Sequence, residues 1–97
     1  MDISTHSNGF KISEELNSFI EEKVSKLETF IDKLTNADVY LKLESHSKVK
    51  DKTVDIKINI PGITLFATET SKTFESATDD AVNSLRRQIK KHKQKRK

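Results

Sequence analysis

The side chains with the clearest potential for chemistry are the cations near the C-terminal end of this 97-residue chain. None of the last twelve residues is acidic and eight are basic: Arg86, Arg87, Lys90, Lys91, Lys93, Lys95, Arg96 and Lys97. The chain has 18 Lys+Arg and 15 Asp+Glu, so the preceding part carries an excess of acids although the formal net charge is +3. Charge separated this sharply favours a polyanionic partner, and nucleic acid is the first candidate.

A structural role for these cations is the competing interpretation, because Lys and Arg near a helix C-terminus interact favourably with the helix dipole and keep a protein soluble. Two or three cations would be enough for that role. At helical spacing, one stripe holds Arg86, Lys90, Lys93 and Lys97, and Arg87 and Lys91 lie on an adjacent stripe. Only part of the cluster can therefore face a single groove.

Catalysis is a poor interpretation of this sequence. The chain has no cysteine, and its histidines, His6, His46 and His92, lie far apart without metal-ligand spacing. Asp79 and Asp80 are neighbours and cannot share one helix face. Two glycines are too few for a phosphate-binding loop. We expect no catalytic residue, no metal and no cofactor.

The absence of cysteine and of an apolar leader suits a soluble, cytoplasmic protein. Membrane binding is disfavoured because Leu85 and Ile89, the large apolar residues of the basic segment, are needed by the fold. No helix-turn-helix or zinc-finger spacing points to DNA. An RNA surface of defined shape fits better.

Two helices are predicted from apolar spacing. The first covers residues 13–34, with Ser13 as N-cap, and the second begins at about Thr73 and ends at about His92. The first predicted apolar face is Leu16, Phe19, Ile20, Val24, Leu27, Phe30, Ile31 and Leu34; the second is Phe74, Ala77, Ala81, Leu85 and Ile89. If Phe30 is buried, Phe30→Ala would cost about 3–5 kcal/mol.

Three runs of alternating apolar residues predict strands with one buried face. Their inward residues are Val39, Leu41 and Leu43; Val54, Ile56, Ile58 and Ile60; and Ile63, Leu65 and Ala67. Pro61-Gly62 predicts a tight turn, and Ser45–Lys52 a longer loop, giving an antiparallel meander. A short strand at Asp2–His6, with Ile3 inward, should precede the first helix and pair parallel to the second strand.

The predicted fold class is α+β, with the order β-α-β-β-β-α and a four-stranded sheet that carries both helices on one face. This arrangement resembles the double-stranded RNA-binding domain. Residues 1–92 should form a single domain, and residues 93–97 a basic C-terminal tail.

The first helix carries a second set of cations. Lys23, Lys26 and Lys33 fall on one flank of its apolar stripe, whereas most of its acids fall elsewhere. If this flank faces the second helix, the lysines extend the basic cluster into one patch. The sequence leaves open which flank faces inward.

Three segments carry a resemblance to a known family: Ile12-Ser13-Glu14-Glu15-Leu16, Lys23-Val24-Ser25-Lys26-Leu27-Glu28 with Asp32-Lys33-Leu34, and the closing residues 85–93, Leu-Arg-Arg-Gln-Ile-Lys-Lys-His-Lys. The chain resembles the ribosome hibernation promoting factor family, also called ribosome-associated inhibitor or sigma-54 modulation proteins, in its short form. The match covers nearly the whole chain, and the predicted element order is that of the family.

The resemblance implies a bacterial stationary-phase and stress-response factor that binds the small ribosomal subunit and inhibits translation. Residues 1–92 would be the ribosome-binding domain, placed where messenger RNA and the A- and P-site transfer RNAs would otherwise lie. The residues implied to contact ribosomal RNA are Lys23, Lys26, Lys33, Arg86, Arg87, Lys90, Lys91 and Lys93, with His92 as an additional contact. Long members add a domain that pairs two ribosomes. For this chain the resemblance leaves two expectations open: pairing with the help of a separate factor, or stabilisation of idle monomeric ribosomes only.

The alternative is a general RNA- or DNA-binding protein or chaperone that uses the same basic patch. Such a protein would bind many duplexes with similar affinity, whereas a hibernation factor would prefer assembled small subunits.

Overall fold

Seven elements make up the fold, and their order confirms the predicted one. The computed structural model describes residues 1–31, 33–43 and 51–95. The elements are β1 (Asp2–Ser7), α1 (Glu14–Ser25), the 3-10 helix η1 (Lys26–Thr29), β2 (Asn36–Leu43), β3 (Lys52–Ile60), β4 (Ile63–Ser71) and α2 (Phe74–Lys95).

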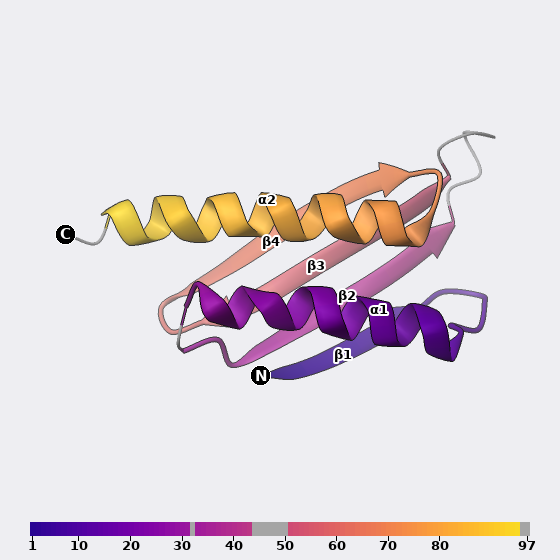
Figure 1. The fold of residues 1–97 in the computed structure, drawn as a ribbon, viewed down its shortest axis with the longest axis horizontal. Helices are drawn as coiled ribbons and strands as arrows, with labels where there is room; N and C mark the ends of the chain where they lie inside the picture. Colours follow the sequence, from indigo (N-terminus) through magenta and orange to yellow (C-terminus); the bar gives the residue numbers. More distant parts are fainter. Residues whose placement is uncertain (32, 44–50, 96–97) are drawn as a thin grey trace.

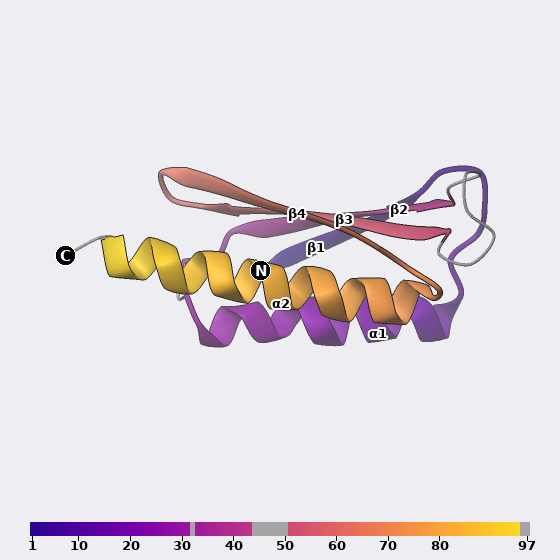
Figure 2. The same ribbon diagram turned by 90° about the horizontal axis from the view of Figure 1, so that it is seen from above.

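The sheet has the strand order β1-β2-β3-β4, with β1 parallel to β2 and the other pairs antiparallel. Pro61 and Gly62 connect β3 to β4, and Gly62 has a φ of 85°, which glycine adopts without steric cost. Both helices cover the same face of the sheet (Figures 1 and 2). The predicted parallel pair, meander and two-layer packing are therefore confirmed. The predicted loop Ser45–Lys52 lies outside the described residues except for Asp51 and Lys52, and Lys52 begins β3.

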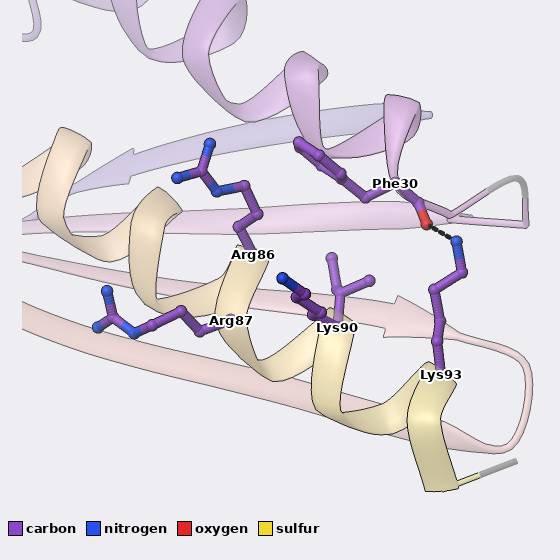
Figure 3. A pocket seen from close by; sticks show the side chains of 6 residues that line it. Phe30, Arg86, Arg87, Lys90 and Lys93 are labelled. Carbon is purple, nitrogen blue, oxygen red and sulfur yellow. Dashed lines mark hydrogen bonds between the residues drawn. The ribbon is translucent and has the colours of Figure 1, made fainter.

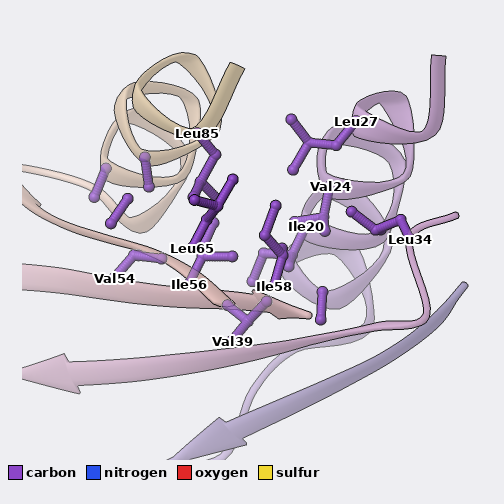
Figure 4. Packing of buried hydrophobic residues seen from close by; sticks show 14 of the residues in the cluster. Ile20, Val24, Leu27, Leu34, Val39, Val54, Ile56, Ile58, Leu65 and Leu85 are labelled. Atoms are coloured by element: carbon purple, nitrogen blue, oxygen red, sulfur yellow. The ribbon is translucent and has the colours of Figure 1, made fainter. Parts of the chain in front are cut away.

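One apolar core lies between the sheet and the helices (Figure 4). All five predicted apolar residues of α2 are buried, and the strands contribute Val39, Leu41, Val54, Ile56, Ile58, Ile60, Leu65 and Ala67. In α1 and η1 the buried residues are Ile20, Val24 and Leu27, while Leu16 and Ile31 are partly buried against the core. Each helix thus presents one stripe to the sheet and leaves its flanks exposed.

Side-chain oxygens cap both helices. Ser13 Oγ accepts a hydrogen bond from Leu16 N–H at 3.1 Å, which confirms the predicted N-cap. Thr73 Oγ1 accepts one from Ser76 N–H at 3.0 Å. α2 continues to Lys95, beyond the predicted end near His92, so the first part of the predicted tail is helical. The division of the chain at residue 92 stays a prediction.

The first helix is shorter than predicted, and Phe30 is not a core residue. α1 ends at Ser25 and the 3-10 turn ends at Thr29. Ser25 Oγ and Thr29 Oγ1 donate to the carbonyls three residues earlier, at 2.9 and 2.7 Å, and such bonds compete with regular helix. Phe30 follows this turn and is 37% exposed, whereas Leu34 is buried at this end of the core.

The prediction that Leu43 faces the core is also wrong, since its exposed fraction is 53%. Leu43 pairs with Lys52, and Lys52 pairs with Ser71, so the last cross-strand row on the helix side is polar. Without apolar cross-strand neighbours, Leu43 has little surface to pack against.

The face of the sheet opposite the helices is exposed in part. Tyr40 and Phe66 are 37% and 52% exposed there. Lys42 forms an ion pair of 2.8 Å with Asp55, which is largely buried in the neighbouring strand. Lys57 lies on the same face, where it is exposed.

The exposure of Phe30 makes a prediction about stability. Leu85→Ala should lower the free energy of unfolding by about 2–5 kcal/mol, because Leu85 is fully buried. Phe30→Ala should cost clearly less than Leu85→Ala, because 37% of Phe30 is exposed whereas Leu85 is fully buried. Urea unfolding of both variants checks this, and equal losses would contradict the placement of Phe30.

Candidate nucleic-acid interface

The flanks of the two helical segments form a groove on the outer side of the molecule. One hollow, of about 480 Å³, is lined by Phe30, Arg86, Arg87, Ile89, Lys90 and Lys93 (Figure 3). A second, of about 500 Å³, is lined by Lys23, Lys26, Thr29, Phe30, Asp79, Val82, Asn83 and Arg86. Because Phe30 and Arg86 border both hollows, we treat them as one surface, the cationic groove.

The structure answers which flank of the first helix faces α2. Lys23 and Lys26 line the groove together with Arg86, so the lysine flank faces inward and extends the basic cluster of α2. Lys33 lies in the turn before β2, where it is exposed, and it lines neither hollow. The first helical segment therefore contributes two of its three predicted lysines to the groove.

The predicted cations of α2 divide between the groove and the outer surface. Arg86, Arg87, Lys90 and Lys93 line the groove. Lys91 is exposed and His92 is partly buried, and neither lines the two hollows. Lys97 of the predicted stripe lies outside the described residues. The 3.6-residue period of the helix explains this division, since Lys90 and Lys91 point about 100° apart.

Specific contacts hold three groups of the groove in place. Lys93 Nζ donates to the Phe30 carbonyl oxygen at 2.5 Å and ties the last turns of α2 to the end of η1 (Figure 3). The Arg86 guanidinium carbon lies 5.8 Å from the centre of the Phe30 ring. Lys23 Nζ lies 3.5 Å from an Asp79 carboxylate oxygen. The rest of the groove is less constrained.

Most of the positive charge in the groove is uncompensated. Among the described residues, no acidic side chain forms an ion pair with Lys26, Arg87 or Lys90. Of the described residues that line the two hollows, Asp79 is the one acid. Cations gathered in this way raise the local concentration of anions and favour binding of phosphates.

Phe30 is the residue of this surface that the sequence analysis assigned wrongly. An aromatic residue in phase with an apolar stripe is ordinarily a core residue, and that spacing placed Phe30 inside. The available signal was the pair of hydroxyls at Ser25 and Thr29, which donate to carbonyls three residues earlier where the regular helix gives way to a 3-10 turn.

No other cluster suggests a metal or catalytic site within the described ranges. His6 stacks on Tyr40 at 4.8 Å and lies 3.7 Å from Asp38, on the sheet rather than in a pocket. His46 falls outside the described residues. In residues 1–31, 33–43 and 51–95, no group of three or more His, Cys, Asp or Glu side chains could hold a metal ion. The same residues include no helix long and apolar enough to cross a membrane.

A four-stranded sheet that carries two helices on one face, with a cationic groove between them, defines a small α+β domain that presents cations along one surface. The chain belongs to the Sigma 54 modulation protein / S30EA ribosomal protein family, whose model matches residues 3–97. The family resemblance seen in the sequence is therefore confirmed.

Curated relatives share about a third of their aligned residues with this chain. Ribosome hibernation promoting factor of Pseudomonas putida is 30% identical over 95 residues, which cover 98% of this chain and 89% of that protein. Ribosome hibernation promotion factor of Staphylococcus aureus is 30% identical over 88 residues, which cover 91% of this chain. The matched region is 46% of the Staphylococcus aureus protein, so this chain spans less than half of that relative.

Solved structures show the same fold. A ribosomal subunit interface protein from Coxiella burnetii has a TM-score of 0.84 and 27% identity, over 96% of this chain and 98% of that one. The N-terminal domain of Thermus thermophilus Protein Y has a TM-score of 0.83 and 25% identity, over 95% and 99% of the two chains. The predicted fold class is thus confirmed along almost the whole chain.

The ion pair between Lys23 and Asp79 predicts an effect on polyanion affinity. Asp79→Asn should change the free energy of unfolding by about 1 kcal/mol or less, because the pair is partly exposed. It should also delay elution from a heparin column to higher salt, because it removes an acid that lines the groove.

The matched control is Asp80→Asn, which removes the same charge from an adjacent, exposed position that does not line the groove. Asp80→Asn should delay elution less than Asp79→Asn. Equal delays would mean that total charge, rather than the groove, determines heparin binding.

Proposed function

We propose that this protein is a ribosome hibernation factor that binds ribosomal RNA of the small subunit and inhibits translation. Support comes from two findings: the family, two of whose members are named ribosome hibernation factors, and the cationic groove. The observation that carries the proposal is that, among the described residues, six cations from two helical segments line one groove together with a single acid.

Binding in the channel for messenger RNA and the A- and P-site transfer RNAs would inhibit translation by occupancy alone. Such a role needs no catalytic group and no cofactor, only a shape and charge that complement RNA. In this role the protein protects idle ribosomes in stationary phase or under stress, in the cytoplasm.

Nine residues are proposed to face ribosomal RNA, and they differ in position. The six groove cations Lys23, Lys26, Arg86, Arg87, Lys90 and Lys93 would contact phosphates along one path. Lys33, Lys91 and His92 lie outside the two hollows and would make peripheral contacts. Each phosphate neutralised by Lys or Arg releases counterions, so affinity should fall steeply with salt.

A charge reversal in the groove tests the proposal. Lys90→Glu should greatly reduce co-sedimentation of the protein with small ribosomal subunits, because it places an acid among the cations that would contact phosphates. The measurement is the fraction of protein that sediments with small subunits at low and at moderate salt. Binding of the same protein to an arbitrary RNA duplex is measured for comparison.

The control is Lys57→Glu, the same change on the sheet face opposite the helices, where Lys57 is exposed. Lys57→Glu should sediment with subunits as the unmodified protein does. Loss of binding in both variants would argue against the groove. Equal binding of the unmodified protein to arbitrary duplexes would favour a general nucleic-acid binder instead.

Lys26 and Lys33 should contribute unequally to binding. Lys26→Ala should reduce the slope of log affinity against log salt concentration by about one, the loss of one phosphate contact, because Lys26 lines the groove beside Arg86. Lys33→Ala should have a smaller effect, since Lys33 lies beyond η1. Affinities for small subunits over a series of salt concentrations check this, and a larger effect for Lys33 would contradict the assigned path.

A further inference from the structure

Phe30 is an aromatic side chain among cations, at the point where the two hollows meet. It directly follows η1, borders both hollows and is 37% exposed. A single exposed aromatic residue is ordinary in a protein surface. What distinguishes Phe30 is its surroundings, because six cationic residues line the hollows that it borders.

Phe30 has contacts with two cations of α2. Lys93 Nζ holds the carbonyl oxygen of Phe30 at 2.5 Å, and the Arg86 guanidinium carbon lies 5.8 Å from the ring centre (Figure 3). Ile89 is fully buried and lines the hollow beside the ring. The groove thus presents the exposed ring of Phe30, with Ile89 packed beside it, among cationic side chains.

An amphipathic groove of this kind matches a nucleotide better than a bare phosphate. Phosphates need only the cations, whereas an exposed aromatic ring beside a guanidinium offers two planar groups on which a nucleobase can stack. In an RNA duplex the faces of the bases are covered by their neighbours. Only an unpaired or extruded nucleotide can present its base to Phe30.

We propose that the cationic groove holds an unpaired nucleotide of its RNA, with the base stacked on the Phe30 ring next to Arg86. The flanking phosphates lie against the cations of α2 and η1, among them Lys90 and Lys26. This inference rests on the proposed function in one respect, that the groove binds RNA, and adds that part of the recognised RNA is single-stranded or bulged.

The probe is a pair of end-labelled RNA hairpins with the same stem and one bulged position. One hairpin carries adenosine in the bulge and the other carries an abasic nucleotide, so both have the same phosphates and differ only in the base. Fluorescence anisotropy should show that the protein prefers the bulged adenosine by about 5- to 150-fold, the range for one stacked base. The preference should change little with salt, although both affinities fall as salt rises.

Variants at two exposed phenylalanines assign the preference to the groove. Phe30→Leu keeps an apolar side chain but removes the ring, and it should bind both hairpins with the affinity that the unmodified protein has for the abasic one. Phe30→Tyr keeps the ring and should keep the preference. The control Phe66→Leu changes a residue on the open sheet face, 52% exposed, and should leave the preference intact.

Three results would overturn the inference: no preference in the unmodified protein, a preference that survives Phe30→Leu, or an equal loss of affinity for both hairpins in Phe30→Leu. The last result would mean that Phe30 only positions Arg86. These results leave the proposed function standing if Lys90→Glu still abolishes binding to small subunits. Failure of the subunit experiment with an intact base preference would instead reject the ribosomal role alone.

Discussion

The structure depends on one constraint: a four-stranded sheet with a single apolar face must be covered by two helices that each have one apolar stripe. Side-by-side packing on that face meets the constraint and brings the inner flanks of the helices together. The flanks carry Lys23 and Lys26 on one side and Arg86 on the other. The cationic groove is therefore a consequence of how the core is buried.

Packing also explains how like charges can be gathered without unfolding the domain. Repulsion between two exposed charges 4 Å apart is about 1 kcal/mol in water. Burial of one large aliphatic side chain contributes about 1.5–3 kcal/mol, and Ile20, Leu27, Leu85 and Ile89 are all fully buried behind the groove. The free energy gained by burying the core can thus offset the repulsion between the cations, and a bound anion would then reduce that repulsion. Asp79, paired with Lys23, partly neutralises one end of the groove.

The sequence predicted the fold well where periodicity and packing agree. Alternation along β2, β3 and β4, the stripe of α2 and the Ser13 cap each describe a local pattern that the tertiary structure retains. Prediction failed where an element ended. Phe30 is in phase with the stripe of α1, but α1 ends at Ser25 and the 3-10 turn at Thr29, before that residue. Leu43 alternates correctly, but its cross-strand neighbour Lys52 offers no apolar surface.

The sequence predicted which residue types form the candidate site better than it predicted how those residues are arranged. The density of positive charge identified the cations of both helices. Which flank of the first helix faces inward depends on how the two helices are rotated relative to each other, and local sequence patterns do not determine that rotation. The exposed ring of Phe30 beside Arg86 follows from that same rotation together with the early end of the helix. Contacts between elements distant in sequence determine these features, and local patterns cannot supply them.

The central claim is that the groove occupies the transfer RNA path of the small subunit, and displacement of a bound transfer RNA tests it most directly. Labelled transfer RNA is bound to the P site of small subunits with a short messenger RNA, and the protein is then titrated in. We predict stoichiometric release of transfer RNA as the protein binds. Stable complexes in which the subunit carries both the protein and the transfer RNA would contradict the claim.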